Sequence, residues 1–205
     1  MRTLSVMLFV AVVGFFVMFS PLTKSAVPFW LMMPMTAGLL ATVSLFLERK
    51  SLDGIYQFRP AHVTIGLSAA GSLYLIFWVG HFVSVHILPF AASQIDSIYS
   101  IREGQNPVWL ALLLVLVIGP AEEIFWRGFV QRRFSRKYGI LIGFIIAASV
   151  YTLVHIGSFN LMLIAASAVC GGFWGLLYVA TGNLWPCIIS HAVWDVAIFI
   201  AFPIK

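Results

Sequence analysis

Charged residues are scarce in this sequence. Only 9% of its 205 residues are Asp, Glu, Lys or Arg, whereas 61% are hydrophobic. An ordinary soluble domain carries about 25% charged residues. A chain so poor in charge cannot cover its surface with side chains suited to water, so lipid must be part of its solvent. This excludes an ordinary soluble domain, and the sequence predicts an integral membrane protein.

Cysteine is nearly absent as well. Cys170 and Cys187 are the only two, and both lie inside or at the edge of apolar segments. Small buried hydrophobic residues are a better interpretation of this pair than a disulfide or a metal site. The formal net charge is +5, and its distribution over the loops reports membrane topology and not a nucleic-acid partner. The seven tryptophans are expected to be mostly lipid-facing or interfacial anchors.

Long apolar runs are abundant. About 20 apolar residues are needed to cross the hydrocarbon core, and we expect seven such helices, within a range of six to eight. The third is long enough to be tilted or to break near Gly80, and the first is expected to be retained and not cleaved as a signal peptide. The sequence predicts an all-α, polytopic transmembrane bundle in a single integral membrane domain, 1–205, with helices near 4–20, 26–47, 63–90, 107–126, 139–157, 160–181 and 184–202.

Lysine and arginine in the loops predict the orientation, because cytoplasmic loops carry an excess of them. With a cytoplasmic N-terminus and seven spans, only Lys24, Arg102 and Lys205 fall outside. Eight basic residues then lie inside: Arg2, Arg49, Lys50, Arg59, Arg132, Arg133, Arg136 and Lys137. We therefore expect a cytoplasmic N-terminus and a C-terminus on the opposite side.

Acidic residues occur where an apolar chain should avoid them. The stretch "VIGPAEEIFWRGFVQRRF" contains Glu122, Glu123 and Arg127, and a charge at the bilayer centre costs about 2.5–3.5 kcal/mol on insertion scales. Glu123 and Arg127 are four residues apart, so on a helix they share a face and can pair. Gly119-Pro120 lies just upstream and predicts a helix break that would place both glutamates near a helix N-terminus.

Two further polar pairs follow in later helices. Tyr151 and His155 are four residues apart, and so are His191 and Asp195. Each pair occupies one helical face, and in lipid a polar face must point towards the bundle interior. Carboxylates and histidines in a common interior can move a proton between water and a leaving amine, or donate to a developing oxyanion. They can equally bind a divalent metal, and spacing alone does not separate these two routes to hydrolysis.

Together the three motifs resemble those of the CPBP intramembrane proteases, the family of the CAAX prenyl endopeptidases and the Abi-type, bacteriocin-processing or immunity proteins. The resemblance spans residues 108–200, with the motifs in family order: Glu122-Glu123-x-x-x-Arg127, Tyr151-x-x-x-His155 and His191-x-x-x-Asp195. It implies a helical bundle that cleaves a peptide bond of a membrane-anchored protein or peptide, such as a CAAX-type terminus or a C-terminal sorting or leader segment.

The resemblance also implies roles for these residues. Glu122 and His155 would activate the water, and His191 and Asp195 would stabilise the oxyanion or position the substrate. The remaining motif residues would shape the site or bind the substrate: Glu123, Arg127 and Tyr151.

The sequence departs from the family pattern at two positions. Tyr151 stands where the family usually has phenylalanine, and Asp195 stands where prenyl-processing members have asparagine. Asp195 could serve as a metal ligand, or it could stay protonated and act as a hydrogen-bond donor. If a zinc ion is used, its expected ligands are Glu122, His155, His191 and Asp195, although a metal-free, glutamate-dependent mechanism is favoured.

Two other functions remain possible at this point. Intramembrane carboxylates and histidines also relay charge in proton- or ion-coupled transporters, but transporters usually show repeated halves, and no repeat is visible here. A catalytically inactive family scaffold or immunity protein is the third interpretation. The expected location is the cell membrane of a prokaryote, with a membrane-anchored substrate and lipid as partners.

The proposed roles carry one geometric condition. On a seven-span topology Glu122 lies towards the inner leaflet and His155 nearer the outer end of its helix. They can meet only if the fourth helix continues well past Arg127, or if the fifth begins near Ser135.

Overall fold

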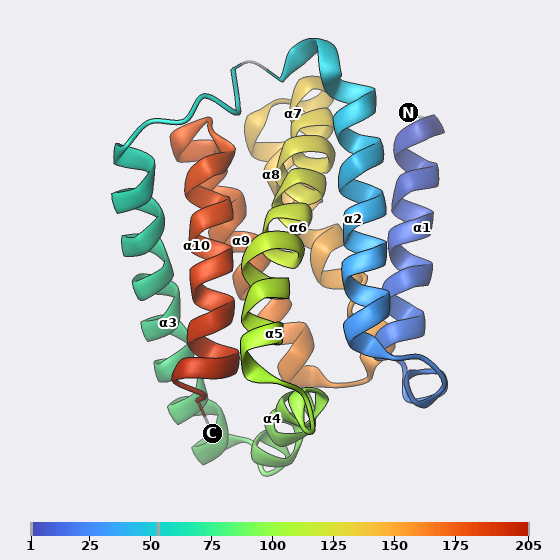
Figure 1. The fold of residues 1–205 in the computed structure, drawn as a ribbon, viewed down its shortest axis with the longest axis vertical. Helices are drawn as coiled ribbons and strands as arrows, with labels where there is room; N and C mark the ends of the chain where they lie inside the picture. Colours follow the sequence, from blue (N-terminus) through green and yellow to red (C-terminus); the bar gives the residue numbers. More distant parts are fainter. Residues whose placement is uncertain (1, 53, 205) are drawn as a thin grey trace.

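The computed structural model describes residues 2–52 and 54–204, and the regular structure of these residues is helical throughout. As predicted, seven of its helices are long and apolar enough to cross a membrane. The chain is thus an all-α polytopic bundle, whose termini lie at opposite ends (Figure 1). The spans are Arg2–Phe19, Phe29–Ser51, Ala61–Ile87, Pro107–Tyr138, Ile140–Ser158, Leu161–Thr181 and Leu184–Ala201.

The last helix lies between the third and fourth spans (Figure 1). It packs against the third, fourth and sixth spans, while the first two spans pack together at the other flank (Figure 1). The major elements are α1 (Arg2–Phe19), α2 (Phe29–Glu48), α3 (Ala61–Ile87), α8 (Ile140–Leu153), α9 (Leu161–Thr181), α10 (Leu184–Val196) and the π-helical η7 (Ala197–Ala201). The last three spans follow one another through short connections and pack as neighbours, α8 on α9 and α9 on α10.

The fourth span is one continuous helix from Pro107 to Tyr138, longer than the predicted 107–126. The expected break at Gly119-Pro120 is wrong. The N–H of Gly119 donates to the carbonyl of Leu114 in a π turn, and the helix continues. Proline lacks an N–H, and its ring clashes with the carbonyl four residues earlier in a regular α-helix. A wider π turn accommodates that ring without ending the helix.

The fourth span therefore has five consecutive parts: α5 (Pro107–Leu113), η4 (Leu114–Ile118), α6 (Gly119–Phe125), η5 (Trp126–Gln131) and α7 (Arg132–Tyr138), of which η4 and η5 are π-helical. Asn106 caps its start by accepting from the N–H of Val108 at 2.9 Å. Gly139, with φ of 87°, ends it and turns the chain directly into α8. The first of the two alternative conditions for bringing Glu122 and His155 together is met, because the fourth helix runs past Arg127 to Tyr138; the fifth begins at Ile140 and not near Ser135.

The connection after the third span holds a helix that hydropathy did not predict. α4 (Ala91–Tyr99) and the 3-10 turn η3 (Ser100–Arg102) lie across the end of the bundle that holds the C-terminus (Figure 1). Asn160, at the start of α9, holds α4 by donating from Nδ2 to the carbonyl of Gln94 at 2.9 Å. α3 itself is continuous, so the possible break near Gly80 is not found.

The basic residues follow the predicted division between the two ends. The start of α1, the turn η2 (Arg49–Ser51), the start of α3 and all of α7 lie at one end (Figure 1). We call this the basic end. The connection that contains Lys24, together with η3, which contains Arg102, lies at the other end, and Lys205 is outside the described residues. Which end faces the cytoplasm stays a prediction.

Candidate active site

A glycine lets the two site-bearing helices approach each other closely. A Cβ atom on Gly119 would lie 3.2 Å from the backbone nitrogen and Cα of Ala192 in α10. The backbones of α6 and α10 therefore touch at this point. One turn further along α6 come Glu122 and Glu123, and beside Ala192 on α10 is His191. The close contact explains how two sequence motifs, nearly 70 residues apart, form one cluster.

The carboxylate of Glu123 connects the other side chains of this cluster. The Glu123 side chain is fully buried, and its Oε1 lies 2.8 Å from Arg127 Nη1 and 2.8 Å from His191 Nδ1. The ion pair predicted between Glu123 and Arg127 is thus confirmed, with an additional histidine partner from another helix. A buried carboxylate needs such charge-assisted partners, because desolvation penalises it heavily otherwise.

Arg127 lies behind Glu123, away from any open space. Its Nη2 donates to the carbonyl of Cys170 at 3.4 Å, and its guanidinium lies 5.0 Å from the ring centre of Tyr151 and 5.5 Å from that of Trp174. Aromatic faces stabilise a desolvated cation. These contacts use the arginine to support Glu123, so a role in holding a substrate carboxylate is not indicated by its surroundings.

The two ring nitrogens of His191 have different surroundings: Nδ1 contacts Glu123, whereas Nε2 faces Glu122 and Asp195. Its ring stacks on Trp174 at a centroid separation of 3.8 Å and an angle of 17°. Because Nδ1 contacts a carboxylate oxygen of Glu123, we assign the proton to Nδ1. That bond fixes the orientation of the ring, and Nε2 then points towards Glu122 and Asp195.

Glu122 and Asp195 face the free edge of His191. Glu122 Oε2 and Asp195 Oδ2 each lie 3.6 Å from His191 Nε2, too far for a direct hydrogen bond. Within the described residues, Glu122 Oε1 and Glu123 Oε2 are buried without a hydrogen-bond partner. Separations of this size between polar groups are typical of sites where a water or a substrate atom sits between them.

His155 comes from the end of α8, on the far side of the same space. Its Nδ1 lies 2.8 Å from the carbonyl of Tyr151 and donates to it, which leaves Nε2 as the available ring atom. The imidazole packs edge-on against Phe15 at 5.0 Å between centroids. Tyr151 packs edge-on against Trp126 at 5.1 Å. An aromatic cage of this kind restricts the orientation of His155 in a place with few polar partners.

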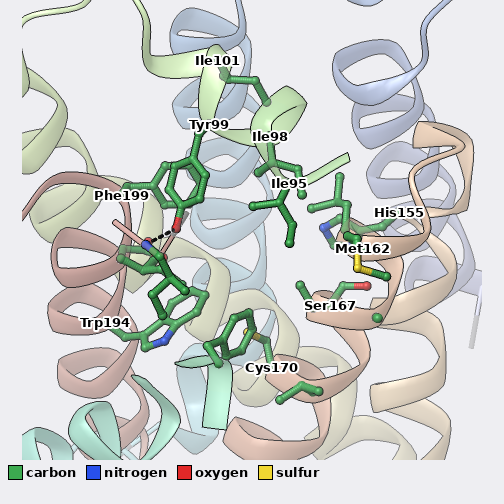
Figure 2. A pocket seen from close by; sticks show the side chains of 18 of the residues that line it. Ile95, Ile98, Tyr99, Ile101, His155, Met162, Ser167, Cys170, Trp194 and Phe199 are labelled. Carbon is green, nitrogen blue, oxygen red and sulfur yellow. Dashed lines mark hydrogen bonds between the residues drawn. The ribbon is translucent and has the colours of Figure 1, made fainter. Parts of the chain in front are cut away.

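Each of the three motifs contributes to the lining of one cavity of about 350 Å³. Glu122, Tyr151, His155, His191 and Asp195 line it, whereas Glu123 and Arg127 are not among its lining residues. Most of its wall is apolar. Figure 2 shows His155 on one side, Trp194 and Phe199 on the opposite side, and the isoleucines and Tyr99 of the α4 region along a third.

The α4 region is also tied to the C-terminal residues at this cavity. The N–H of Ile204 donates to the hydroxyl of Tyr99 at 3.1 Å, the dashed line in Figure 2. Burial raises the pKa of Tyr99, so this hydroxyl stays neutral and keeps its hydrogen-bonding capacity. The cavity therefore has a polar, proton-active wall and an apolar wall closed in part by α4.

A metal ion was one of the two routes predicted from the residue types. Within residues 2–52 and 54–204, no three His, Cys, Asp or Glu side chains are arranged to hold a metal ion. This holds for Glu122, His155, His191 and Asp195, no three of which are arranged as a common ligand set. These residues therefore do not fit the expected zinc site, and the mechanism proposed below has no step at a metal.

Sequence patterns identified the members of the site but not its connections. The contact between Glu123 and His191 joins two helices that are distant in the sequence. The motifs predicted only that these residues would lie in the same bundle interior. Trp174 was missed altogether: it is fully buried under His191, an exception to the expectation of lipid-facing tryptophans. A weak signal exists in the sequence, since Trp174 lies between small residues in "CGGFWG", where another helix can approach closely.

Comparison with known proteins gives one match. The family model described as type II CAAX prenyl endopeptidase Rce1-like matches residues 104–197, which include all three motifs. No curated protein and no solved structure matches the chain significantly. The match agrees with the resemblance drawn from the three motifs: residues 104–197 are similar to the CPBP/CAAX family of intramembrane proteases.

Proposed function

We propose that this protein is an intramembrane endopeptidase that hydrolyses a peptide bond of a membrane-anchored protein or peptide through a water activated by Glu122. One observation carries the proposal. Glu122 is buried and lines the cavity with one oxygen unpartnered among the described residues, while the other faces His191 at 3.6 Å. A buried carboxylate with an unpartnered oxygen at a cavity has the geometry of a general base that can accept a proton from a water.

In the proposed reaction, Glu122 and His155 hold the attacking water from two sides of the cavity. Glu122 takes a proton from the water as its oxygen attacks the carbonyl carbon of the scissile peptide. When the C–N bond breaks, Glu122 returns this proton to the leaving amine. The low-dielectric wall formed by Phe19, Trp194 and their apolar neighbours strengthens each of these electrostatic contacts.

His191 and Asp195 are proposed to stabilise the oxyanion or to position the substrate. In its protonated form, His191 can donate from Nε2 to the oxygen on which negative charge develops. Glu123 holds the ring through Nδ1, and Arg127 holds Glu123. We therefore propose that Glu123 and Arg127 are positioning residues. Tyr151 would shape the cavity wall beside His155.

The test is proteolysis by the purified protein in detergent, with a panel of membrane-anchored peptides. Wild type is compared with Glu122→Gln and His155→Asn, each with and without a chelator. Glu103→Gln removes an exposed carboxylate and His86→Asn an exposed histidine, so they serve as matched controls. Loss of a general base lowers the rate by about 10²–10⁴-fold, and we expect this for Glu122→Gln while both controls cleave normally.

The outcomes discriminate among the three functions. Cleavage that depends on Glu122 and His155 and survives chelation supports the proposal. Cleavage lost on chelation and restored by zinc would place the same residues in a metal site. If a well-folded preparation cleaves no peptide of the panel, the inactive scaffold and the transporter become the better interpretations.

A further inference from the structure

The two ends of the bundle differ in charge. The basic end carries η2, α7 and the starts of α1 and α3, with Arg49, Lys50, Arg136 and Lys137 exposed there. The opposite end carries α4, η3 and the C-terminus (Figure 1). Short cytoplasmic loops are enriched in lysine and arginine. The basic end is therefore expected to face the cytoplasm.

The cavity belongs to the opposite half of the bundle. Its lining residues on α10 and η7 begin at His191 and continue towards the C-terminus, and those on α3 begin at Ile76. On α9, which starts at the α4 end, the lining stops at Trp174. Ile95, Ile98 and Tyr99 of α4 complete the wall at that end (Figure 2). Each helix thus gives the cavity its portion nearest to α4.

The layer between Glu122 and the basic end is closed. Phe129, Val130, Leu184 and Cys187 in this layer are fully buried. Gln131, 2% exposed, donates from its side chain to the carbonyl of Gly175 at 2.9 Å and ties the fourth span to α9. Close packing of this kind leaves no path for water or a peptide. Access to Glu122 is therefore from the α4 side.

From these observations we infer that the substrate reaches the site from the non-cytoplasmic side of the membrane. The inference rests on the proposed function and names its substrate class: exported polypeptides, anchored in the membrane, whose scissile bond lies in the outer half of the bilayer or just beyond it. Their apolar segment fits the apolar part of the cavity wall, and the scissile carbonyl lies next to Glu122. A polypeptide whose cleavage site is presented from the cytoplasmic leaflet would meet the closed layer.

The orientation is tested first. Ser25→Cys places a thiol in the exposed connection at the α4 end, and Lys50→Cys places one at the basic end. Wild type reports background, because Cys170 and Cys187 are buried. A membrane-impermeant thiol reagent added to intact cells that produce the full-length protein should label Ser25→Cys and leave Lys50→Cys at background. Labelling of Lys50→Cys alone would overturn the inference.

The sidedness of cleavage is tested next in the same cells. A peptide tail cleaved in the detergent panel is fused to one transmembrane anchor in two topologies, with the tail outside or inside. We expect cleavage of the outside tail and, for the inside tail, a rate no higher than that of Glu122→Gln cells. Cleavage of the inside tail alone, or of both tails at equal rates, would contradict the inference while leaving the peptidase intact. Absence of cleavage even in detergent would instead remove the proposed function, and this inference with it.

Discussion

Two clusters of glutamate and arginine lie at different depths in this bundle, and their charge balance is opposite. At the basic end, Glu48 accepts from Arg133 at 2.7 Å and from Arg136 at 2.8 Å, with Arg132 at 3.7 Å. In the interior, Glu122, Glu123 and Asp195 have one guanidinium nearby among the residues that the structure describes, that of Arg127. The basic-end cluster surrounds one carboxylate with cations, whereas the interior cluster has more carboxylates than cations.

The difference distinguishes a structural cluster at the basic end from the candidate catalytic cluster in the interior. Both oxygens of Glu48 have arginine partners, and Arg133 and Arg136 are 24% and 48% exposed, so water completes their hydration. This carboxylate stabilises the packing of α2 on α7. Because both of its oxygens already accept hydrogen bonds from arginines, it is not suited to bind a substrate or to act as a base. The interior cluster keeps unpartnered oxygens beside a cavity. Such a buried arrangement costs stability and is typical of functional sites.

Removal of the guanidinium of Arg127 should have the largest effect. Arg127→Met leaves Glu123 buried without its counter-charge, and breaking a buried ion pair costs about 3–5 kcal/mol. We expect a large drop in the detergent unfolding temperature and loss of cleavage. A double variant, Arg127→Met with Glu123→Leu, should recover much of the stability but no activity, because His191 then lacks its support. Recovery of activity by the double variant would contradict the positioning role of this pair.

The close contact between α6 and α10 should be the next most sensitive feature. Gly119→Ala places a methyl group 3.2 Å from the backbone of Ala192, which cannot move aside cheaply. Overpacking of this kind costs about 1–3 kcal/mol, and a shift of 1 Å in reacting groups costs about 10²-fold in rate. We expect kcat to fall more than stability. Gly172→Ala, at a position with open space on α9, is the matched control and should behave as wild type.

Asp195→Asn asks whether the negative charge at this position is needed. Asp195 lies 3.6 Å from His191 Nε2 without a direct bond, so an amide of the same shape can still orient a substrate. We expect kcat/KM to change by no more than about 10-fold, less than the effect of losing a general base. A complete loss of cleavage, together with loss of bound zinc measured on the purified protein, would instead assign Asp195 to a metal site.

The smallest effect is expected at the basic end. Glu48→Gln removes one carboxylate from a cluster whose arginines remain partly hydrated, and hydrogen bonds to charged groups contribute about 1.5–3 kcal/mol at most. The unfolding temperature should fall slightly, whereas kcat/KM of the folded protein should equal that of wild type. A loss of activity without a loss of stability in this variant would contradict the claim that the Glu48 cluster has only a structural role.

Hydropathy and local spacing predicted the seven spans and the pairing of Glu123 with Arg127, because both depend on neighbours within one helix. The length of the fourth span was not predictable in this way. Its charged part, α7, continues the helix outside the apolar run, where Arg133 and Arg136 bind Glu48 of another helix. Hydropathy also missed α4, a short helix with serine and aspartate on its exposed side.

The connections within the site depend on contacts between distant segments. The contact of Glu123 with His191 spans 68 residues, a separation over which helical spacing makes no prediction. The three motifs indicated which residues would share the interior. Only the fold indicated that His191 contacts Glu123 on one edge and faces Glu122 on the other.

The most direct test of the account is the ratio of kcat/KM between Glu122→Gln and Glu48→Gln, measured on one membrane-anchored peptide after equal amounts of folded protein have been verified. Both substitutions replace a buried glutamate by its amide. We predict that Glu48→Gln matches wild type and that Glu122→Gln is slower by about 10²–10⁴-fold. Equal rates for the two variants would contradict the assignment of Glu122 as the group that activates water.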